Sequence, residues 1–393
     1  MTAALILAIL SGISALIWST RHILIWREQR NNELLTPDSA GVNGSVPHVS
    51  VFVAAKDEEE NIETCVRTML AQDYPHFDMT VCNDRSADRT GQIVAGVARE
   101  DPRLRLLNIE HLPAGWCGKC HAMWNGIAQS DSEWICMSDA DCRQLSPRTL
   151  SVAVRYAIDN KIDLLSLMPA LDMQGFWENT IQPVCSGVMM IWYQPEKVNN
   201  PAKSNAYANG AFILMRRSAY QAVGNHEAVK DKLMEDMHLA ARVKKAGLKL
   251  RVMRSSGLYS VRMYTSLQQI LRGWSRIFFG TFGTLPRLTV SLIVLLVISM
   301  LPYAAAPIGL TMAAADGPHA GAWLVAGLLG TLSALMQLTV IYRFYKIAGA
   351  KASLFWTYPF ACVIVTWTLL LALNKHRPGA KVVWRNTAYA KSQ

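Results

Sequence analysis

The stretch HVSVFVAAKDEEENIETCVRTMLAQDYPHFDMTVCN, residues 48–83, contains the pattern that decides the fold. Its first part, His48–Ala55, is a short β-branched run that stops at a charged loop, as a buried strand does. Asn61–Gln72 then carries apolar residues at helical spacing, and Met79–Asn83 is again strand-like. A strand, a helix and a second strand in this order predict a parallel α/β unit.

The alternation continues further along the chain. A second helix is predicted at Gly91–Arg99, and two more strands at Leu104–Ile109 and Glu133–Ser138. We therefore expect a mainly parallel sheet with helices on both faces. Ligands of such sheets bind beyond the carboxyl ends of the strands, and the polar clusters of this sequence fall at those ends.

Composition indicates a membrane-bound part. The 393 residues are 51% hydrophobic and 17% charged, whereas soluble domains are typically about 25% charged. The uncharged run Thr2–Trp18 is followed by arginines and lacks a convincing cleavage site, which favours a retained anchor over a signal peptide. Three more runs, about Leu288–Ala313, Ala322–Tyr342 and Leu354–Leu373, are long enough to cross a hydrocarbon core of about 30 Å. Buried helices of a large soluble core are the less favoured alternative, because these runs lack a polar face.

The loop charges predict the orientation of these segments. Asp316–His319 has no Lys or Arg, whereas the loop after Tyr342 has several. The positive-inside rule then places residues from Arg21 to about Pro286 in the cytoplasm of a multi-pass protein of the inner (plasma) membrane. Four crossings would put the positively charged tail outside, against the same rule, so the side of the tail stays open. The predicted organisation is an anchor (1–20), a linker (21–47), a cytoplasmic domain (48–286), three membrane helices (287–374) and a basic tail (375–393).

The net charge of +10 does not indicate a nucleic-acid partner. The Lys and Arg residues are scattered and flank apolar segments, so anionic lipids and anionic substrates are the expected partners. Eight cysteines without regular spacing, in a domain placed in the cytoplasm, argue against a disulfide framework.

Paired carboxylates follow the strand predicted at Glu133–Ser138. If the strand continues through them, Asp139 and Asp141 share one face. Two such carboxylates repel unless a cation or a proton compensates, and Mg²⁺ or Mn²⁺ bridging a diphosphate is one solution. A solvated turn is the alternative for Asp-x-Asp alone.

Three other acidic residues are candidates. Asp84 ends a predicted strand and can accept hydrogen bonds from a nucleobase or ribose, although it could also be a turn residue. Glu235 and Asp236 begin a predicted helix. They suit either the helix dipole or a general base that deprotonates a hydroxyl.

An Arg-aromatic segment precedes the first C-terminal apolar run. MYTSLQQILRGWSRIFFG carries Gln269, Arg272 and Trp274. The segment reads as an amphipathic interfacial helix, or as a group that holds a diphosphate at the membrane surface.

The stretch GWCGKC, Gly115–Cys120, raises the possibility of a dithiol centre. Cys117 and Cys120 precede a predicted helix, as in thiol oxidoreductases. A zinc site would need further ligands, and no second Cys-x-x-Cys or His pair supplies them.

Taken in order, these motifs resemble the membrane-bound family 2 glycosyltransferases, which have the GT-A fold that binds nucleotide-diphospho-sugars. The match covers about His48–Gly280, through VFVAAKDEEEN, NDRSADRT, SDADC, LMEDMHLA and QILRGW. Asp57 stands where the family usually has Asn, Arg85 replaces a common Gly, and Gly273 separates Arg272 from Trp274. LPAGWCGKCHAMWNG, ANGAFILMRRSAY and VRMYTSLQQILRGWS are similar to the branch acting on hopanoids, carotenoids and ceramides.

The resemblance implies a catalytic role for Asp236, with Glu235 beside it, and a divalent metal on Asp139 and Asp141. It implies a substrate-binding role for Ala55, Asp57, Glu58, Asp84, Trp116, Lys119, Asp139, Gln269, Arg272 and Trp274. The expected reaction is inverting transfer of a sugar from a nucleotide-sugar to a hydroxyl of a lipid acceptor, with Mg²⁺ or Mn²⁺ as cofactor. A polysaccharide synthase is the first alternative, a thiol oxidoreductase using Cys117 and Cys120 a distant one, and a non-catalytic scaffold the third.

Overall fold

The computed structural model describes residues 1–31, 34–315, 317–377, 382–384 and 387–389. Most of the predicted basic tail, two linker residues and Asp316 lie outside the described residues. The chain forms two compact units. The sheet unit comprises Glu33–Asp172, Trp192–Met263 and Lys381–Gln393, and the apolar-helix unit comprises Met1–Asn32, Met173–Ile191 and Tyr264–Ala380.

The sheet unit contains an eight-stranded sheet of order β1-β10-β7-β9-β5-β2-β3-β4. Neighbouring strands in it are parallel except where β9 pairs with β5 and β7. The prediction of a mainly parallel sheet is therefore confirmed. The strands are β1 Leu34–Leu35, β2 Val49–Ala55, β3 Phe77–Asp84, β4 Leu104–Ile109, β5 Trp134–Asp139, β7 Leu164–Met168, β9 Phe212–Arg216 and β10 Leu250–Ser255.

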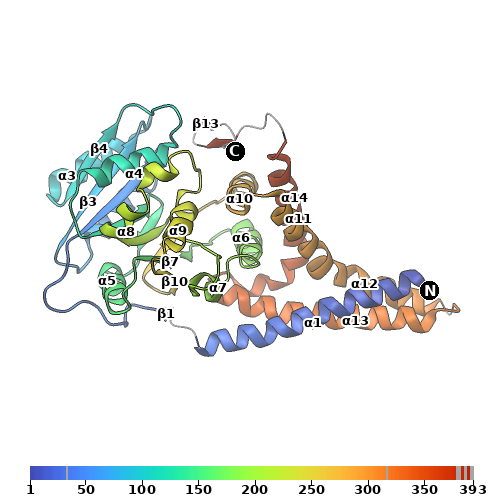
Figure 1. The fold of residues 1–393 in the computed structure, drawn as a ribbon. Helices are drawn as coiled ribbons and strands as arrows, with labels where there is room; N and C mark the ends of the chain where they lie inside the picture. Colours follow the sequence, from blue (N-terminus) through green and yellow to red (C-terminus); the bar gives the residue numbers. More distant parts are fainter. Residues whose placement is uncertain (32–33, 316, 378–381, 385–386, 390–393) are drawn as a thin grey trace. The chain divides into compact units, whose positions relative to one another are not determined.

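Helices cover both faces of this sheet (Figure 1). The central strand β2 has apolar side chains on both faces. On one face, Val51 packs in one core with Ile62 of α2. On the opposite face, the ring of Phe52 approaches Gly126 of α4. Both faces of β2 are thus buried, as in a strand of a covered parallel sheet. The helices are α2 Ile62–Leu70, α3 Thr90–Glu100, α4 Gly118–Ala128, α5 Thr149–Asp159, α7 Pro195–Asn199, α8 Arg217–Ala222, η1 His226–Val229 and α9 Glu235–Lys245.

The strand predicted at Glu133–Ser138 does not continue through the paired carboxylates. Strand β5 ends at Asp139, and Ala140 and Asp141 form a turn instead of continuing the strand. The next strand belongs to a separate sheet of β6 Cys142–Gln144, β11 Tyr259–Val261 and β8 Ala170–Leu171. The alternation rule of a strand therefore does not relate Asp139 to Asp141. A hairpin of β12 Val382–Trp384 and β13 Thr387–Tyr389 completes the described strands.

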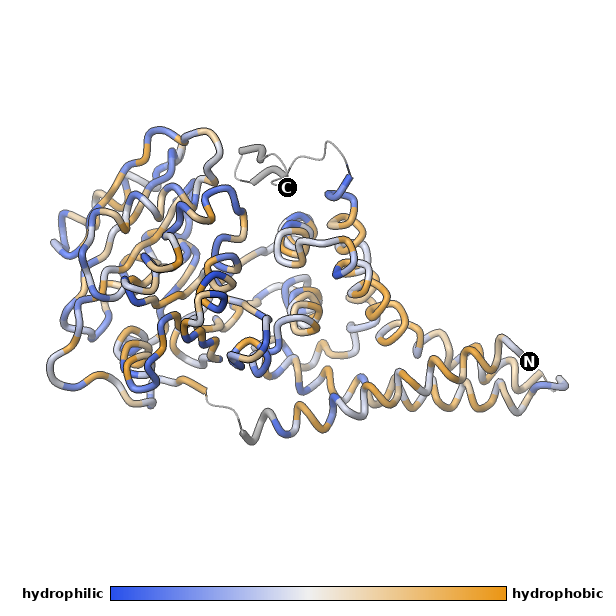
Figure 2. Tube along the Cα trace, in the orientation of Figure 1, coloured by the Kyte–Doolittle hydropathy of each residue, from blue (hydrophilic) through white to orange (hydrophobic). Residues whose placement is uncertain are grey.

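The apolar-helix unit contains the predicted membrane segments. Its helices are α1 Thr2–Asn31, α6 Phe176–Met189, α10 Leu267–Phe282, α11 Leu285–Ile293, η2 Val294–Met300, α12 Leu301–Ala314, α13 Ala320–Ile347, η3 Ala352–Thr357 and α14 Tyr358–Asn374. Four spans in the described part of the chain are long and apolar enough to cross a membrane: Thr2–Arg27, Leu285–Ala314, Ala320–Ile347 and Ala352–Asn374. Figure 2 shows the hydrophobic colouring along α1, α12 and α13. Outward-facing residues such as Leu16, which is 70% exposed, suit a lipid surface.

A π-helical segment joins α1 to α13 through its backbone. In η2 the carbonyl of Ile298 accepts hydrogen bonds from Ser14 Oγ at 2.8 Å and from Trp18 Nε1 at 2.9 Å. Ser14 Oγ also lies 2.8 Å from Ser333 Oγ on α13. A π-helix disturbs the regular backbone ladder, and a backbone group without a partner is costly in hydrocarbon. These contacts supply partners for the Ile298 carbonyl.

Small residues allow α12 and α13 to pack closely. A Cβ added to Gly327 would lie 2.7 Å from the backbone nitrogen of Leu310 and 3.0 Å from the carbonyl carbon of Gly309. Contacts with backbone atoms cannot be relieved by turning a side chain. Close approach through small residues is a common mode of helix association in membranes.

We predict that Gly327→Ala lowers the thermal stability of the protein in detergent micelles by several degrees, because overpacking costs about 1–3 kcal/mol. Gly321→Ala on the same helix is the matched control, since nothing lies within 4 Å of its added Cβ. The midpoint of heat-induced aggregation, followed by size-exclusion chromatography, measures the effect. Equal midpoints for both variants would contradict this packing.

Candidate active site

The candidate site lies where adjacent parallel strands end. β5, β2 and β3 are neighbours in the sheet, so the loops after them meet at one edge. Asp139 is the last residue of β5 and Asp84 the last of β3, while Asp57 and Glu58 follow β2. Ala55, expected to contact the donor, ends β2 with a buried side chain, so only its backbone is available to a ligand.

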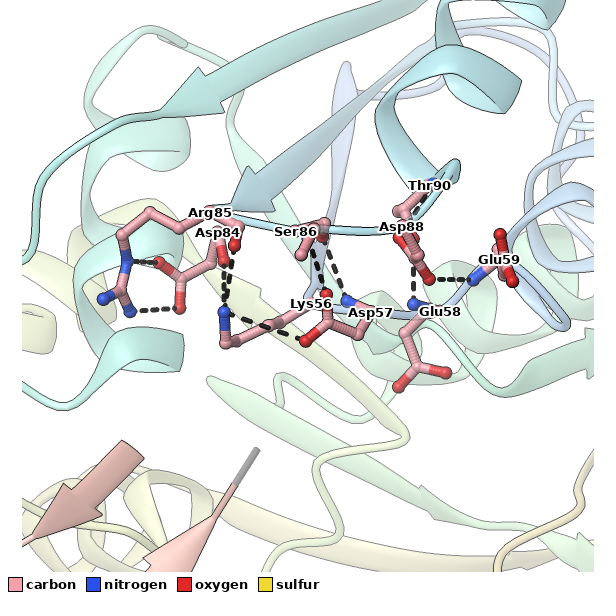
Figure 3. Close-up of polar contacts among 10 residues, drawn as sticks. Lys56, Asp57, Glu58, Glu59, Asp84, Arg85, Ser86, Asp88 and Thr90 are labelled. Atoms are coloured by element: carbon pink, nitrogen blue, oxygen red, sulfur yellow. Dashed lines mark hydrogen bonds and ion pairs between the residues drawn. The ribbon is translucent and has the colours of Figure 1, made fainter. Parts of the chain in front are cut away.

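Hydrogen bonds tie the loop after β2 to the loop after β3 (Figure 3). The backbone N–H of Asp57 donates to Ser86 Oγ at 3.0 Å, and Asp57 Oδ1 accepts from the N–H of Ala87 at 2.8 Å. The N–H of Glu58 donates to Thr90 Oγ1 at 2.8 Å. These hydrogen bonds hold two segments of the predicted donor site together.

Both loops contain a residue in the left-handed backbone region. Asp57 has φ 54° and Arg85 has φ 53°, where Gly is unstrained and Asn is tolerated better than most residues. These are the two positions at which the resembled family usually has Asn and Gly. Lys56 stabilises the turn, since its Nζ donates to the carbonyl of Asp84 at 3.3 Å and to that of Arg85 at 3.0 Å (Figure 3).

Asp84 is held by the residue that follows it. Arg85 Nε donates to Asp84 Oδ1 at 2.8 Å and Arg85 Nη2 to Asp84 Oδ2 at 3.0 Å, a bidentate pair (Figure 3). The Asp84 side chain is 5% exposed. Gly118, the first residue of α4, lies so close that an added Cβ would clash with Asp84 Oδ2. The Gly-Lys phrase is thus packed against this carboxylate.

Lys119 joins two of the predicted acidic motifs. Its Nζ lies 2.6 Å from Asp139 Oδ1 and 2.7 Å from Glu235 Oε1. Burial disfavours its charged form, but Asp139, Glu235 and Asp236 together outweigh that effect and hold the pKa of Lys119 well above its ordinary value. The structure therefore brings the Gly-Lys, Asp-x-Asp and Glu-Asp motifs into one site around a buried ammonium group.

Gly210, which no sequence argument singled out, completes this site. Its backbone N–H donates to Asp236 Oδ2 at 2.9 Å. An added Cβ would lie 3.0 Å from Lys119 Nζ and 3.2 Å from Asp236 Oδ2. A side chain at this position would therefore have to displace Lys119 Nζ and Asp236 Oδ2. Its only signal in the sequence was its place in ANGAFILMRR, just before the antiparallel strand β9.

Two carboxyl groups of the site have raised pKa values. Desolvation raises the pKa of Asp141 to about 8, with contributions from the charges of Asp139 and Glu58. Desolvation and then the charge of Glu235 raise the pKa of Asp236 to about 7. A carboxyl group that titrates near neutral pH can take a proton from a reacting hydroxyl.

Asp139 and Asp141 have the chemistry that a divalent metal requires. Mg²⁺ and Mn²⁺ prefer oxygen ligands and complete their coordination with substrate phosphates and water. The described residues contain no group of three or more His, Cys, Asp or Glu side chains arranged to hold a metal ion. Asp139 and Asp141 are the two residues that would hold such an ion.

The two thiols of GWCGKC are buried and not joined by a disulfide. Cys120 Sγ lies 3.4 Å from the carbonyl oxygens of Val229 and Lys232. A hydrogen bond with Cys120 lowers the pKa of Cys117, and the same bond, with burial, raises that of Cys120. The Trp116 ring packs 5.3 Å from the His121 ring and 5.4 Å from the Trp124 ring, between centroids.

Three predicted substrate-binding residues belong to α10 of the apolar-helix unit. Gln269 Oε1 accepts a hydrogen bond from the N–H of Thr265 at 3.0 Å. Trp274 is 5% exposed and its ring lies 5.5 Å from that of Phe278. Arg272 is on the same helix. Their contacts with a substrate remain predictions.

The sequence is similar to known glycosyltransferases. The sequence profile of glycosyl transferase family 21 matches residues 4–392. The 4,4'-diaponeurosporenoate glycosyltransferase of Staphylococcus aureus (strain USA300) is 23% identical over 248 residues, which are 62% of this chain and 64% of that protein. The match thus spans less than two thirds of the relative's length.

A solved structure shares the fold. The mannosyltransferase PcManGT from Pyrobaculum calidifontis, in complex with GDP-Man and Mn²⁺, superposes with a TM-score of 0.53 over 93% of this chain and 98% of that one, at 19% identity. The predicted GT-A fold is confirmed, and a carotenoid glycosyltransferase among the relatives fits the predicted branch. Because its profile covers nearly the whole sequence, the chain belongs to glycosyl transferase family 21.

Proposed function

We propose that this protein is an inverting glycosyltransferase of the inner (plasma) membrane that moves a sugar from a nucleotide-diphospho-sugar to a hydroxyl of a membrane lipid. The observation that carries the proposal is the position of Asp236. Its carboxyl group has a pKa near 7 and accepts a hydrogen bond from Gly210, while the adjacent Glu235 binds Lys119 beside Asp139.

The donor is assigned to the strand ends. Asp84 would accept hydrogen bonds from the base or ribose, with the Asp57–Glu58 loop beside it. Asp139 and Asp141 would hold Mg²⁺ or Mn²⁺, which supplies charge neutralisation for the diphosphate when bound. The solved relative PcManGT carries GDP-Man and Mn²⁺, which supports this assignment.

The reaction needs one base and one stabilised leaving group. Asp236 would accept the acceptor's proton as the hydroxyl oxygen bonds to the anomeric carbon. The bond from that carbon to the diphosphate oxygen breaks on the opposite face, which inverts the anomeric configuration. Lys119, together with Arg272 as the resemblance implies, would stabilise the negative charge on the departing diphosphate.

A lipid acceptor is supported by the four apolar spans and by the carotenoid-directed relative. We further propose that residues 21–286 are cytoplasmic and that three of the spans follow the catalytic domain. A polysaccharide synthase remains the alternative, and the length of the product distinguishes it from a single-transfer enzyme.

We predict that Asp236→Asn lowers kcat about 10²–10⁴-fold, the usual contribution of a general base, with little change in donor KM. Release of nucleoside diphosphate and sugar transfer into lipid measure it. Asp231→Asn, an exposed carboxylate paired with Lys232 before the same helix, is the control and should keep wild-type activity. Full activity of Asp236→Asn would remove this residue from the base role.

The pH dependence follows from the same carboxyl group. Because only deprotonated Asp236 can act as a base, kcat/KM should fall about tenfold per pH unit below about 7 and level off above it. Glu235, Lys119 and Asp139 are the charged groups that influence this carboxyl. A flat profile between pH 5 and 8 would contradict the assignment.

We predict that EDTA abolishes transfer, and that Asp141→Ala loses most of the activity that Mg²⁺ or Mn²⁺ restores, because one of two carboxylate ligands is gone. Asp159→Ala, at an exposed end of α5, is the control. The measurement is a titration of activity against each cation. An Asp141→Ala enzyme with the wild-type cation dependence would be incompatible with a metal on this residue.

The double variant Cys117→Ser, Cys120→Ser should retain transfer activity, because the proposed chemistry uses neither thiol. A modest loss of thermal stability is expected, since both side chains are buried. Initial rates, measured with and without a reductant, test it. Rates that depend on both thiols would favour the thiol-oxidoreductase alternative.

A further inference from the structure

We propose that Lys119 is an exchangeable counter-ion: its ammonium group neutralises Asp139 and Glu235 while the site is empty, and it transfers to the donor diphosphate when a divalent cation binds. The diphosphate step rests on the proposed function. The competition between Lys119 and the cation rests on the geometry of the site alone.

The charges of the site make a counter-ion necessary. Carboxyl groups enter from three places: Glu58 after β2, Asp139 and Asp141 at the end of β5, and Glu235 and Asp236 at the start of α9. Asp236 Oδ2 and Asp139 Oδ2 lie near one another, at 3.2 Å and 3.6 Å from the position that a Cβ on Gly210 would occupy. Carboxylates at such separations repel unless a cation is present.

Lys119 supplies that cation. Its ion pairs of 2.6 Å with Asp139 and 2.7 Å with Glu235 are short, and the Lys119 and Glu235 side chains are 16% and 7% exposed. A buried ion pair survives only with good geometry, and removal of one partner leaves a costly uncompensated charge. Lys119 therefore stabilises the empty site.

The same contact obstructs metal binding. A divalent ion would need an oxygen of Asp139 at about 2.0–2.2 Å, and Asp139 Oδ1 is already paired with the ammonium group. Binding through Oδ2 leaves the two cations close together, because Oδ2 and Lys119 Nζ both approach the same point beside Gly210. Either oxygen thus brings the metal into repulsion with Lys119.

The local structure lets the ammonium group move while α4 stays in place. A lysine carries its charge on a flexible four-carbon stem, and this one begins at the second residue of α4. Gly210 has no side chain, and a Cβ at this position would lie 3.0 Å from Lys119 Nζ. The space beside the ammonium group is therefore not blocked by a side chain of Gly210. A diphosphate held beside the metal would give the displaced ammonium group a new anionic partner.

The experiment compares the full-length protein with Lys119→Met, Lys119→Arg and Lys245→Met. Lys245 is the matched control, because it lies at the exposed end of the same helix as Glu235 and its loss changes net charge equally. Mn²⁺ affinity is measured at pH 8 by electron paramagnetic resonance. The midpoint of thermal unfolding is measured in EDTA and in Mn²⁺. Both measurements are made with and without UDP or GDP.

We expect Lys119→Met to bind Mn²⁺ about tenfold more tightly than wild type without nucleotide, a difference of about 1.4 kcal/mol. Its thermal midpoint should fall in EDTA and recover in Mn²⁺. Lys119→Arg, which keeps the charge, and Lys245→Met should both resemble wild type. In wild type, nucleotide should tighten Mn²⁺ binding more than it does in Lys119→Met, since only wild type has an ammonium group to relocate.

Unchanged or weaker Mn²⁺ affinity in Lys119→Met would overturn the proposal. A lower thermal midpoint that Mn²⁺ does not restore would also overturn it. Either result would indicate that Lys119 forms a permanent structural ion pair. If Lys119→Met does not fold, Lys119→Gln replaces it. The effect of nucleotide on Mn²⁺ affinity in the wild-type protein then provides a second test. If nucleotide does not change that affinity, the exchange of Lys119 between partners is contradicted. Failure of wild type to bind any nucleoside diphosphate would instead refute the proposed function, while the Mn²⁺ comparison without nucleotide would still test the counter-ion.

Discussion

The ion pairs of Lys119 are the interaction on which the arrangement of the site depends. They join the end of strand β5, through Asp139, to the start of α9, through Glu235, and both contacts are shorter than 3 Å. Without them Asp139 and Glu235 would lose the ammonium group that both contact. One buried lysine thus holds together the end of a strand and the start of a helix.

Backbone constraints around this centre reinforce it. A Cβ on Gly210 would lie 3.0 Å from Lys119 Nζ and 3.2 Å from Asp236 Oδ2, and the N–H of Gly210 donates to Asp236. Gly118 is constrained in the same way by Asp84. The left-handed turn at Arg85 is maintained by a hydrogen bond from Lys56, and Arg85 in turn holds the carboxylate of Asp84.

Much of the fold was predictable, because the hydrophobic periodicity and the composition of a segment can be read from neighbouring residues in the sequence. The strands ending at Ala55 and Asp84, the helix beginning at Glu235 and the four apolar spans appear where hydrophobic periodicity indicates them. The turn at Asp141 was one of two alternatives left open, because an Asp-x-Asp pair alone does not show whether the strand continues through it. Gly210 and the pairing of Lys119 with Glu235 were missed for another reason: both depend on contacts of Lys119, which lies 91 positions before Gly210 and 116 before Glu235.

The central claim is that this carboxylate site transfers a sugar from a nucleotide-sugar to a lipid. The most direct measurement incubates the purified full-length protein with a panel of nucleotide-sugars, Mn²⁺ and a membrane lipid extract, and reads the lipids by mass spectrometry. The account predicts a lipid whose mass has grown by one sugar unit, with stoichiometric release of nucleoside diphosphate. No mass gain and no nucleotide release with any donor would contradict it.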